Sequence, residues 1–313
     1  MTTMARLRGI FAPTLTPVQT DLTPDVGRWI DHCRWLLDSG CHGLCPFGTT
    51  SEANSFSVEE RMDLLEQLVE AGVAPHLLMP GTGCCALTDT VRLTAHSVRL
   101  GCAGVLMLPP FYYKGVSDDG LFRSYAEVIE RVGDHRLRIY LYHIPPMAQV
   151  GISLRLIDRL VSAYPATVVG IKDSSGDWNN LNAILEEFPG FGTFTGNEKF
   201  LLQTLQGGGA GSINAVANVI PAPQRELYDS WQTPEAATMQ REIDQLRTAL
   251  QGFPTIAALK QIMALIRNDP SWLNVRPPLT MLTPAEVDEL LMRIPDISYL
   301  PIPTAHMPEL SPV

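Results

Sequence analysis

Lysine is scarce in this sequence, so the positions of its few lysines are informative. The 313-residue chain has only four, at Lys114, Lys172, Lys199 and Lys260. It also lacks any apolar run of about 18 residues, which argues against a transmembrane helix. Two arginines lie near the start, but Pro13 and Pro17 interrupt the apolar stretch beside them, which is a poor match to a signal peptide. We therefore expect a cytoplasmic protein without a membrane partner.

Basic charge and metal-binding patterns are missing as well. The net charge is −10 and the isoelectric point is about 5.2, which argues against nucleic acid as a partner. None of the six cysteines forms a CxxC pair and no histidine cluster accompanies them, so we expect no metal site and small buried thiols in a reducing compartment. The first strand–helix turn has no GxGxxG, which disfavours a dinucleotide site. We expect no cofactor.

Strand-like and helix-like segments alternate through most of the chain. Eight apolar, β-prone segments are separated by helical patterns, with about 20–30 residues per unit. This pattern predicts an α/β protein with a (β/α)₈ TIM barrel, rather than an open doubly wound sheet. The predicted strands are 9–16, 42–47, 76–83, 103–110, 137–146, 167–172, 191–198 and 210–219.

The region after the eighth strand contains only helical patterns. We expect the barrel strands and helices in residues 1–219, and the last barrel helix with an extra C-terminal helical bundle in residues 220–298. Residues 299–313 contain four prolines and no periodicity, which predicts an extended or disordered tail.

Lys172 is the most unusual of the four lysines. It follows a β-branched run in the sequence ATVVGIKDSSGD, where a strand ends and a turn begins. Burying an ammonium group is costly unless the group is paired or neutral, so one interpretation is a lysine that extends to water just past the strand. The other is an unprotonated lysine that attacks a carbonyl and forms a Schiff base. The lysine strand alone does not decide between them.

Other reactive side chains also occur at the predicted strand ends, which is where active sites of TIM barrels lie. They are Thr49 and Thr50 after the second strand, Tyr112 after the fourth, Tyr142 ending the fifth, Gly196 and Glu198 after the seventh, and Asn214 in the eighth. This distribution favours an active site over a surface lysine.

Five motifs now support a resemblance to a known family. In order along the chain they are GTTSE from Gly48, PFYYKG from Pro110, YHIPP from Tyr142, GIKDSSGD from Gly170 and GGAGSIN from Gly208. The chain resembles the dihydrodipicolinate synthase / N-acetylneuraminate lyase family of class I, Schiff-base-forming barrel enzymes, from about Gly9 to the last helix. The resemblance implies a 2-keto acid or pyruvate as the small-molecule partner, and a homotetramer built as a dimer of dimers.

The resemblance also implies catalytic roles. Lys172 matches the Schiff-base lysine and Tyr142 the neighbouring proton-transferring tyrosine. Thr49 and Thr50 match the hydroxyl pair that binds the substrate carboxylate, and Thr50 would relay a proton to Tyr142. Tyr112 matches a tyrosine supplied across a subunit interface, with Tyr113 as the neighbouring candidate.

Further residues match substrate-binding positions of the family. Gly196, Asn197 and Glu198 match a segment that contacts substrate hydroxyls, although Asn197 and Glu198 would also suit a helix N-terminus. Ile213 and Asn214 match positions facing the lysine. The neighbouring glycine run would also suit a phosphate cradle, but no basic residue accompanies it.

The chain departs from the family pattern at three points, and the last of them, the missing arginine, bears on the substrate. Ser51 replaces a usual glycine, His143 replaces a usual asparagine, and no arginine lies between Arg138 and Arg155, where the synthases carry one. We therefore expect a lyase that cleaves a 2-keto-3-deoxy sugar acid and releases pyruvate. A dehydratase using the same imine and dihydrodipicolinate synthase are the alternatives. A barrel that binds a keto acid without turnover is disfavoured because it would not need the whole set of reactive residues.

Overall fold

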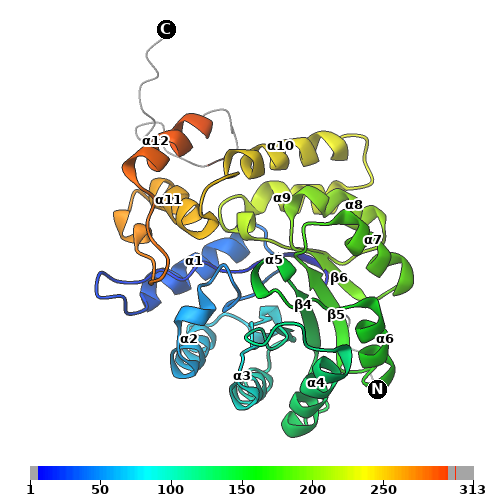
Figure 1. Cartoon of the computed structure of the whole chain (residues 1–313). Coiled ribbons are helices and arrows are strands. Elements are labelled where there is room, and N and C mark those ends of the chain that lie inside the picture. Colours follow the sequence, from blue (N-terminus) through cyan, green and yellow to red (C-terminus); the bar gives the residue numbers. More distant parts are fainter. Residues whose placement is uncertain (1–5, 295–299, 301–313) are drawn as a thin grey trace.

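A computed structural model describes residues 6–294 and Leu300 (Figure 1). Apart from Leu300, the predicted tail at 299–313 lies outside these residues. Within them, seven strands form one parallel sheet in the order β2-β1-β7-β6-β5-β4-β3. The strands are β1 Gly9–Ala12, β2 Gly43–Leu44, β3 Val105–Met107, β4 Ile139–His143, β5 Val168–Asp173, β6 Gly192–Thr195 and β7 Gly211–Ile213.

The third predicted strand lies in the gap between β2 and β3 but is not a regular strand. Leu78 forms a parallel bridge with Leu44 of β2, and Gly81 forms one with Leu106 of β3. The Met79 N–H donates to Leu44 O over 2.8 Å. Between these contacts lies Pro80, which has no N–H to donate to a ladder. The prediction of a full strand at 76–83 was therefore wrong, but the segment occupies the expected place in the barrel.

Several other strands are shorter than predicted, and prolines or caps explain where they end. β1 stops before Pro13, and β4 stops before the short helix that begins at Pro145. The predicted eighth strand ends at Ile213 because the Asn214 side chain accepts the Ala217 N–H and starts a 3₁₀ turn, η4 (Ala215–Asn218).

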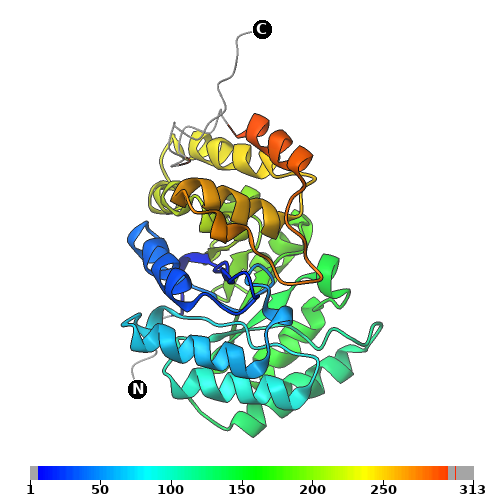
Figure 2. The same cartoon turned by 90° about the vertical axis from the view of Figure 1, so that its left-hand side faces the viewer.

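Helices cover the outside of the sheet (Figures 1 and 2). Ser57 and Glu60 form a capping box at the start of α2. In the described residues the α-helices are α1 Val26–Asp38, α2 Val58–Glu70, α3 Leu87–Arg99, α4 Asp118–Val132, α5 Pro145–Ala148, α6 Leu154–Ala163, α7 Trp178–Glu187, α8 Leu201–Gln206, α9 Pro221–Ser230, α10 Ala236–Ala249, α11 Thr255–Arg267 and α12 Pro284–Arg293.

The chain after β7 is helical in its described part, and α10, α11 and α12 lie together at one end of the molecule (Figure 2). These helices share a core with the barrel, because one apolar cluster contains Ile10 of β1, Leu246 of α10 and Ile262 of α11. A separate apolar cluster fills the barrel interior. Its buried members are Phe11, Cys45, Met79, Leu106, Tyr140, Tyr142, Val169, Phe194, Ala210 and Ile213.

Candidate active site

Lys172 and Tyr142 lie side by side on neighbouring strands. β4 and β5 pair in parallel with Tyr142 opposite Lys172, so both side chains point to the same face, into the barrel. Lys172 is only 4% exposed, and its Nζ lies 4.3 Å from the centroid of the Tyr142 ring. The interpretation of Lys172 as a lysine extending to water was therefore wrong, and the amine is held in a largely apolar interior.

The Tyr142 hydroxyl connects this pair to the loop after β2. It shares a 3.2 Å hydrogen bond with Thr49 Oγ1. The sequence-based prediction assigned this contact to Thr50, which is buried one residue further on. The geometry thus favours Thr49 for the relay contact, and the predicted role of Thr50 in substrate binding stays a prediction.

The side chain and the carbonyl of Ser51 both form buried hydrogen bonds. Its buried hydroxyl donates to Thr14 O over 2.5 Å, and its carbonyl accepts from Thr16 Oγ1 over 3.0 Å. The serine in place of glycine therefore ties the threonine loop to the segment after β1. A small cleft opens beside the loop and Tyr142, lined in part by Gly48, Thr49, Asn54, Gly83, Leu108 and Tyr142.

Asn197 caps a short helical turn, and Glu198 lies near an arginine of a distant helix. Asn197 caps the 3₁₀ turn η3 (Glu198–Phe200) by accepting the Lys199 N–H. Glu198 is 1% exposed, and its Oε1 lies 3.7 Å from Arg247 Nε of α10. Burial raises the pKa of the Glu198 carboxyl, and the Arg247 charge opposes this shift. The described contacts of both side chains are structural, and their predicted contact with substrate hydroxyls stays a prediction.

Gly196 is packed against the end of the lysine strand. Its N–H donates to Asp173 O over 2.6 Å, and a Cβ at this position would lie 1.9 Å from Ser174 Oγ. Glycine is therefore needed for the close approach of β6 to the residues that follow Lys172.

The two predicted eighth-strand residues differ in their surroundings. Ile213 is buried in the interior cluster that also contains Tyr142. The Asn214 side-chain amide donates to Ser212 Oγ over 2.9 Å and to Gln224 Oε1 over 2.6 Å. Asn214 thus joins β7 to α9, and its predicted contact with substrate is not among these hydrogen bonds.

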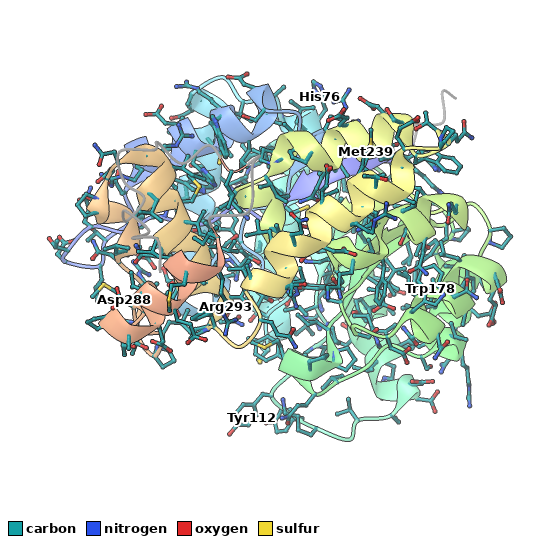
Figure 3. All side chains as sticks on the ribbon, turned by 90° about the horizontal axis from the view of Figure 1, so that it is seen from above. His76, Tyr112, Trp178, Met239, Asp288 and Arg293 are labelled. Carbon is teal, nitrogen blue, oxygen red and sulfur yellow. The ribbon has the colours of Figure 1, made fainter. Side chains whose placement is uncertain are left out.

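Tyr112 and Tyr113 lie far out on the loop after β3. They are 73% and 74% exposed and pack edge to face, with ring centroids 5.3 Å apart. Tyr112 projects away from the body of the molecule in Figure 3. The predicted role of Tyr112 across a subunit interface stays a prediction.

A buried ion pair next to the site was missed by the sequence-based prediction. Glu52, the last residue of GTTSE, pairs with Lys260 of α11, and both side chains are fully buried. The scarcity of lysine was the available signal, because a second lysine in a helix rich in apolar residues would need a partner.

A second pair that the sequence-based prediction missed lies at the ends of β4 and β5. His143 and Asp173 occupy opposite positions of β4 and β5, directly after Tyr142 and Lys172. His143 Nδ1 accepts the Ile152 N–H, and burial lowers the pKa of the ring, opposed by the Asp173 charge. Asp173 accepts from the Ser175 N–H and from Asn180 Nδ2, both over 2.7 Å. These contacts order the turn that follows Lys172.

The described residues contain no cluster of three or more metal-ligating side chains. No described helix has the length and apolar character that crossing a bilayer requires. The cysteines are all free; Cys33, Cys41 and Cys45 are buried as expected, whereas Cys85 is exposed.

Comparison with known proteins assigns the family. The profile of the dihydrodipicolinate synthetase family matches residues 6–295. The chain belongs to this family. The resemblance recognised from the five motifs is thereby confirmed.

Relatives and solved structures within the family carry different names. The chain is 34% identical over 289 residues to an uncharacterised DapA-like lyase of Chloroflexus aurantiacus, covering 92% of this chain and 96% of the relative. It is 30% identical to a 4-hydroxy-tetrahydrodipicolinate synthase of Methanococcoides burtonii, covering 90% and 95%. The crystal structure of dihydrodipicolinate synthase from Agrobacterium tumefaciens superposes with a TM-score of 0.85 at 32% identity, covering 91% and 98%. These likenesses support a TIM-barrel lyase or aldolase and leave the substrate open.

Proposed function

We propose that this protein is a class I lyase that forms a Schiff base between Lys172 and a 2-keto acid of the 2-keto-3-deoxy sugar acid type. The observation that carries the proposal is the position of Lys172 Nζ, 4.3 Å from the Tyr142 ring, whose hydroxyl bonds to Thr49. An amine in an apolar interior, beside a hydroxyl chain, has what imine chemistry needs.

The reaction follows from these three side chains. The Lys172 amine attacks the C2 carbonyl and water is lost, which leaves an iminium. Loss of that water takes a proton from the Tyr142 hydroxyl, and the resulting phenolate, which the Thr49 hydroxyl can hydrogen-bond, then takes the proton of the 4-hydroxyl. The C3–C4 bond breaks, its electron pair moves toward the iminium nitrogen, and an aldehyde leaves. Protonation of the enamine at C3 and hydrolysis release pyruvate and free Lys172.

Pyruvate as product or substrate is supported by a structural neighbour. A prophage protein of the dihydrodipicolinic acid synthase family from E. coli, with a TM-score of 0.85 and 24% identity, was solved in complex with pyruvate. The hydroxyls and N–H groups of the Thr49–Thr50 loop are suited to a carboxylate. We extend the proposal to a homotetramer in the cytoplasm in which the exposed Tyr112 crosses to a neighbouring subunit.

Two related activities remain as alternatives. A dehydratase would use the same imine and eliminate water in place of an aldehyde. The synthase activity is favoured by the 30% identity to the synthase named above, but no arginine lies between Arg138 and Arg155 to bind a second carboxylate. For this reason the lyase is preferred.

Reductive trapping tests the proposal. The protein is incubated with pyruvate, reduced with borohydride and weighed intact by mass spectrometry, with Lys172→Ala as the matched control. We expect one pyruvate adduct per chain in the native protein and none in the variant. Absence of the adduct, or an adduct that persists in Lys172→Ala, would exclude the mechanism. A panel of sugar-derived keto acids and aspartate semialdehyde then separates cleavage, dehydration and condensation.

A further inference from the structure

We infer that Glu52 and Lys260 are positioning residues, whose buried ion pair sets the distance between the Thr49 hydroxyl and Tyr142. The inference depends on the proposed function, because it concerns proton transfer at the imine. Neither side chain touches the Lys172–Tyr142 pair in the contacts described above. Their effect would pass through the backbone of the threonine loop.

The pair is fully buried and fully partnered. Both side chains have 0% exposure, and Lys260 Nζ donates to Glu52 Oε1 and, over 2.7 Å, to Asn274 O. Glu52 Oε2 accepts the Arg276 N–H over 2.9 Å. Burial lowers the pKa of Lys260, and the Glu52 charge opposes that shift. One carboxylate therefore joins the loop after β2 to α11 and to the segment beyond it, more than 200 residues away in sequence.

The backbone transmits this anchor to Thr49. Glu52 has a φ of 58°, in the left-handed region that a non-glycine residue rarely adopts. Its N–H donates to Thr49 O over 3.1 Å, and the Ala53 N–H donates to Gly48 O over 3.2 Å. Glu52 thus closes the turn that contains Thr49, and a shift of its carboxylate would move that turn.

Arg276 holds the other side of the same loop. Its guanidinium lies 3.9 Å from the centroid of the Phe56 ring, and donates to Ser55 O over 2.7 Å and to Glu60 Oε2 over 3.0 Å. Lys260 of α11 and Arg276 beyond that helix therefore hold the loop at Glu52 and Ser55.

The energetics favour a geometric purpose for the pair. Replacing a buried ion pair by apolar residues of similar volume is often neutral or stabilising, so stability alone does not explain such a pair. The Thr49–Tyr142 hydrogen bond, at 3.2 Å, is already at the long end for two hydroxyls. A small displacement of the loop would break it, and a misplacement of about 1 Å can cost roughly 100-fold in rate.

Exchange of the pyruvate methyl protons with D2O measures proton transfer at the imine. The assay needs only pyruvate, so the aldehyde product does not have to be identified. The imine loses a C3 proton to give the enamine and regains a deuteron, which proton NMR follows. Lys260→Met leaves the Glu52 charge unpaired and should lower both thermal stability and exchange. The double variant E52Q/K260M removes both charges at similar volume, so its melting temperature should recover while exchange at saturating pyruvate stays about 10- to 100-fold below the native rate.

Two further variants keep the test decisive. Leu137→Ala opens a cavity at the opposite, N-terminal end of β4, and should lower the melting temperature with native exchange. Glu52→Asp keeps both charges but shortens the reach of the carboxylate, and should slow exchange even if the double variant does not fold.

The outcomes separate the two proposals. Native exchange in a folded double variant, or in Glu52→Asp, would overturn the positioning role while the Schiff-base mechanism stands. If the native protein forms no borohydride-trapped adduct, the proposed function fails and this inference fails with it. Borohydride trapping of the variants should still give the pyruvate adduct, because Lys172 lies on β5 and not on the loop.

Discussion

At the scale of single residues, the position and direction of a side chain distinguish the residues of the candidate site from others of the same type. Thr49 and Thr50 are adjacent and chemically identical, yet only Thr49 shares the described hydrogen bond with Tyr142. Lys172 is set apart from the other lysines by its position opposite Tyr142 on the next strand. The two threonines can therefore be separated by experiment.

Replacing each threonine by valine removes one hydroxyl at nearly constant volume. We expect Thr49→Val to slow pyruvate proton exchange at saturation by about 10²-fold, because the relay partner of Tyr142 is lost. Thr50→Val serves as the matched variant, and should chiefly raise the pyruvate concentration needed for half-saturation. The reverse pattern in NMR exchange rates would assign the relay to Thr50, as the sequence-based prediction did.

At the scale of elements, the ends of neighbouring strands hold one another in place. β5 and β6 meet where Gly196 packs against Asp173 and Ser174, directly after Lys172. The close approach of these two strand ends leaves no room for a side chain at position 196. This constraint is seen only when the pairing of β5 with β6 is known.

Gly196→Ala tests this contact. A Cβ 1.9 Å from Ser174 Oγ and 2.9 Å from Asp173 O must push the two strand ends apart. We expect a loss of about 1–3 kcal/mol in the free energy of unfolding and a marked loss of exchange activity. In the control, Gly27→Ala, the nearest atom is 4.0 Å from the new Cβ within α1, so stability should rise by up to about 1 kcal/mol. Equal behaviour of the two variants in urea unfolding would contradict the prediction.

At the scale of the whole molecule, distant segments meet around His32 in α1. Its ring stacks on Trp35, packs edge-on against Trp272 with centroids 4.9 Å apart, and its Nε2 lies 3.0 Å from Asn218 Oδ1. Burial lowers the pKa of His32 from 6.5 to about 4, with the Arg267 charge contributing and the Asn218 hydrogen bond opposing. The folded protein therefore holds this ring neutral.

This depressed pKa predicts a stability loss in acid. The unfolded state binds the proton more readily, so the stabilisation is present above pH 6.5 and is lost as the pH falls from there toward 4. Between about pH 7 and pH 4.5 the native protein should lose roughly 2–3 kcal/mol more than His32→Phe, which cannot titrate. Urea unfolding at both pH values measures the difference, and parallel losses in the two proteins would refute the assignment to His32.

Much of the architecture was predictable because it is encoded locally. The alternating periodicity indicated a TIM barrel. Lys172 and Tyr142 each end an apolar run, which placed them at the carboxyl ends of their strands, where TIM-barrel active sites lie. Strand lengths were less predictable, because Pro80, Pro145 and the Asn214 cap act through single backbone groups that a hydrophobic pattern does not register. The contact of Glu198 with Arg247 also depended on α10, which is remote in sequence.

The sequence by itself determined the fold class and the family, and it singled out Lys172 as the proposed Schiff-base lysine, since these depend on periodicity and on residue types at fixed local spacing. Only the tertiary structure decided which threonine meets Tyr142, that Glu198 turns toward Arg247, and that Glu52 finds Lys260. The physical reason is the same in each case. A side chain's partner depends on the packing of segments far apart in the chain, and a buried charge can be satisfied only by the group that packing brings to it.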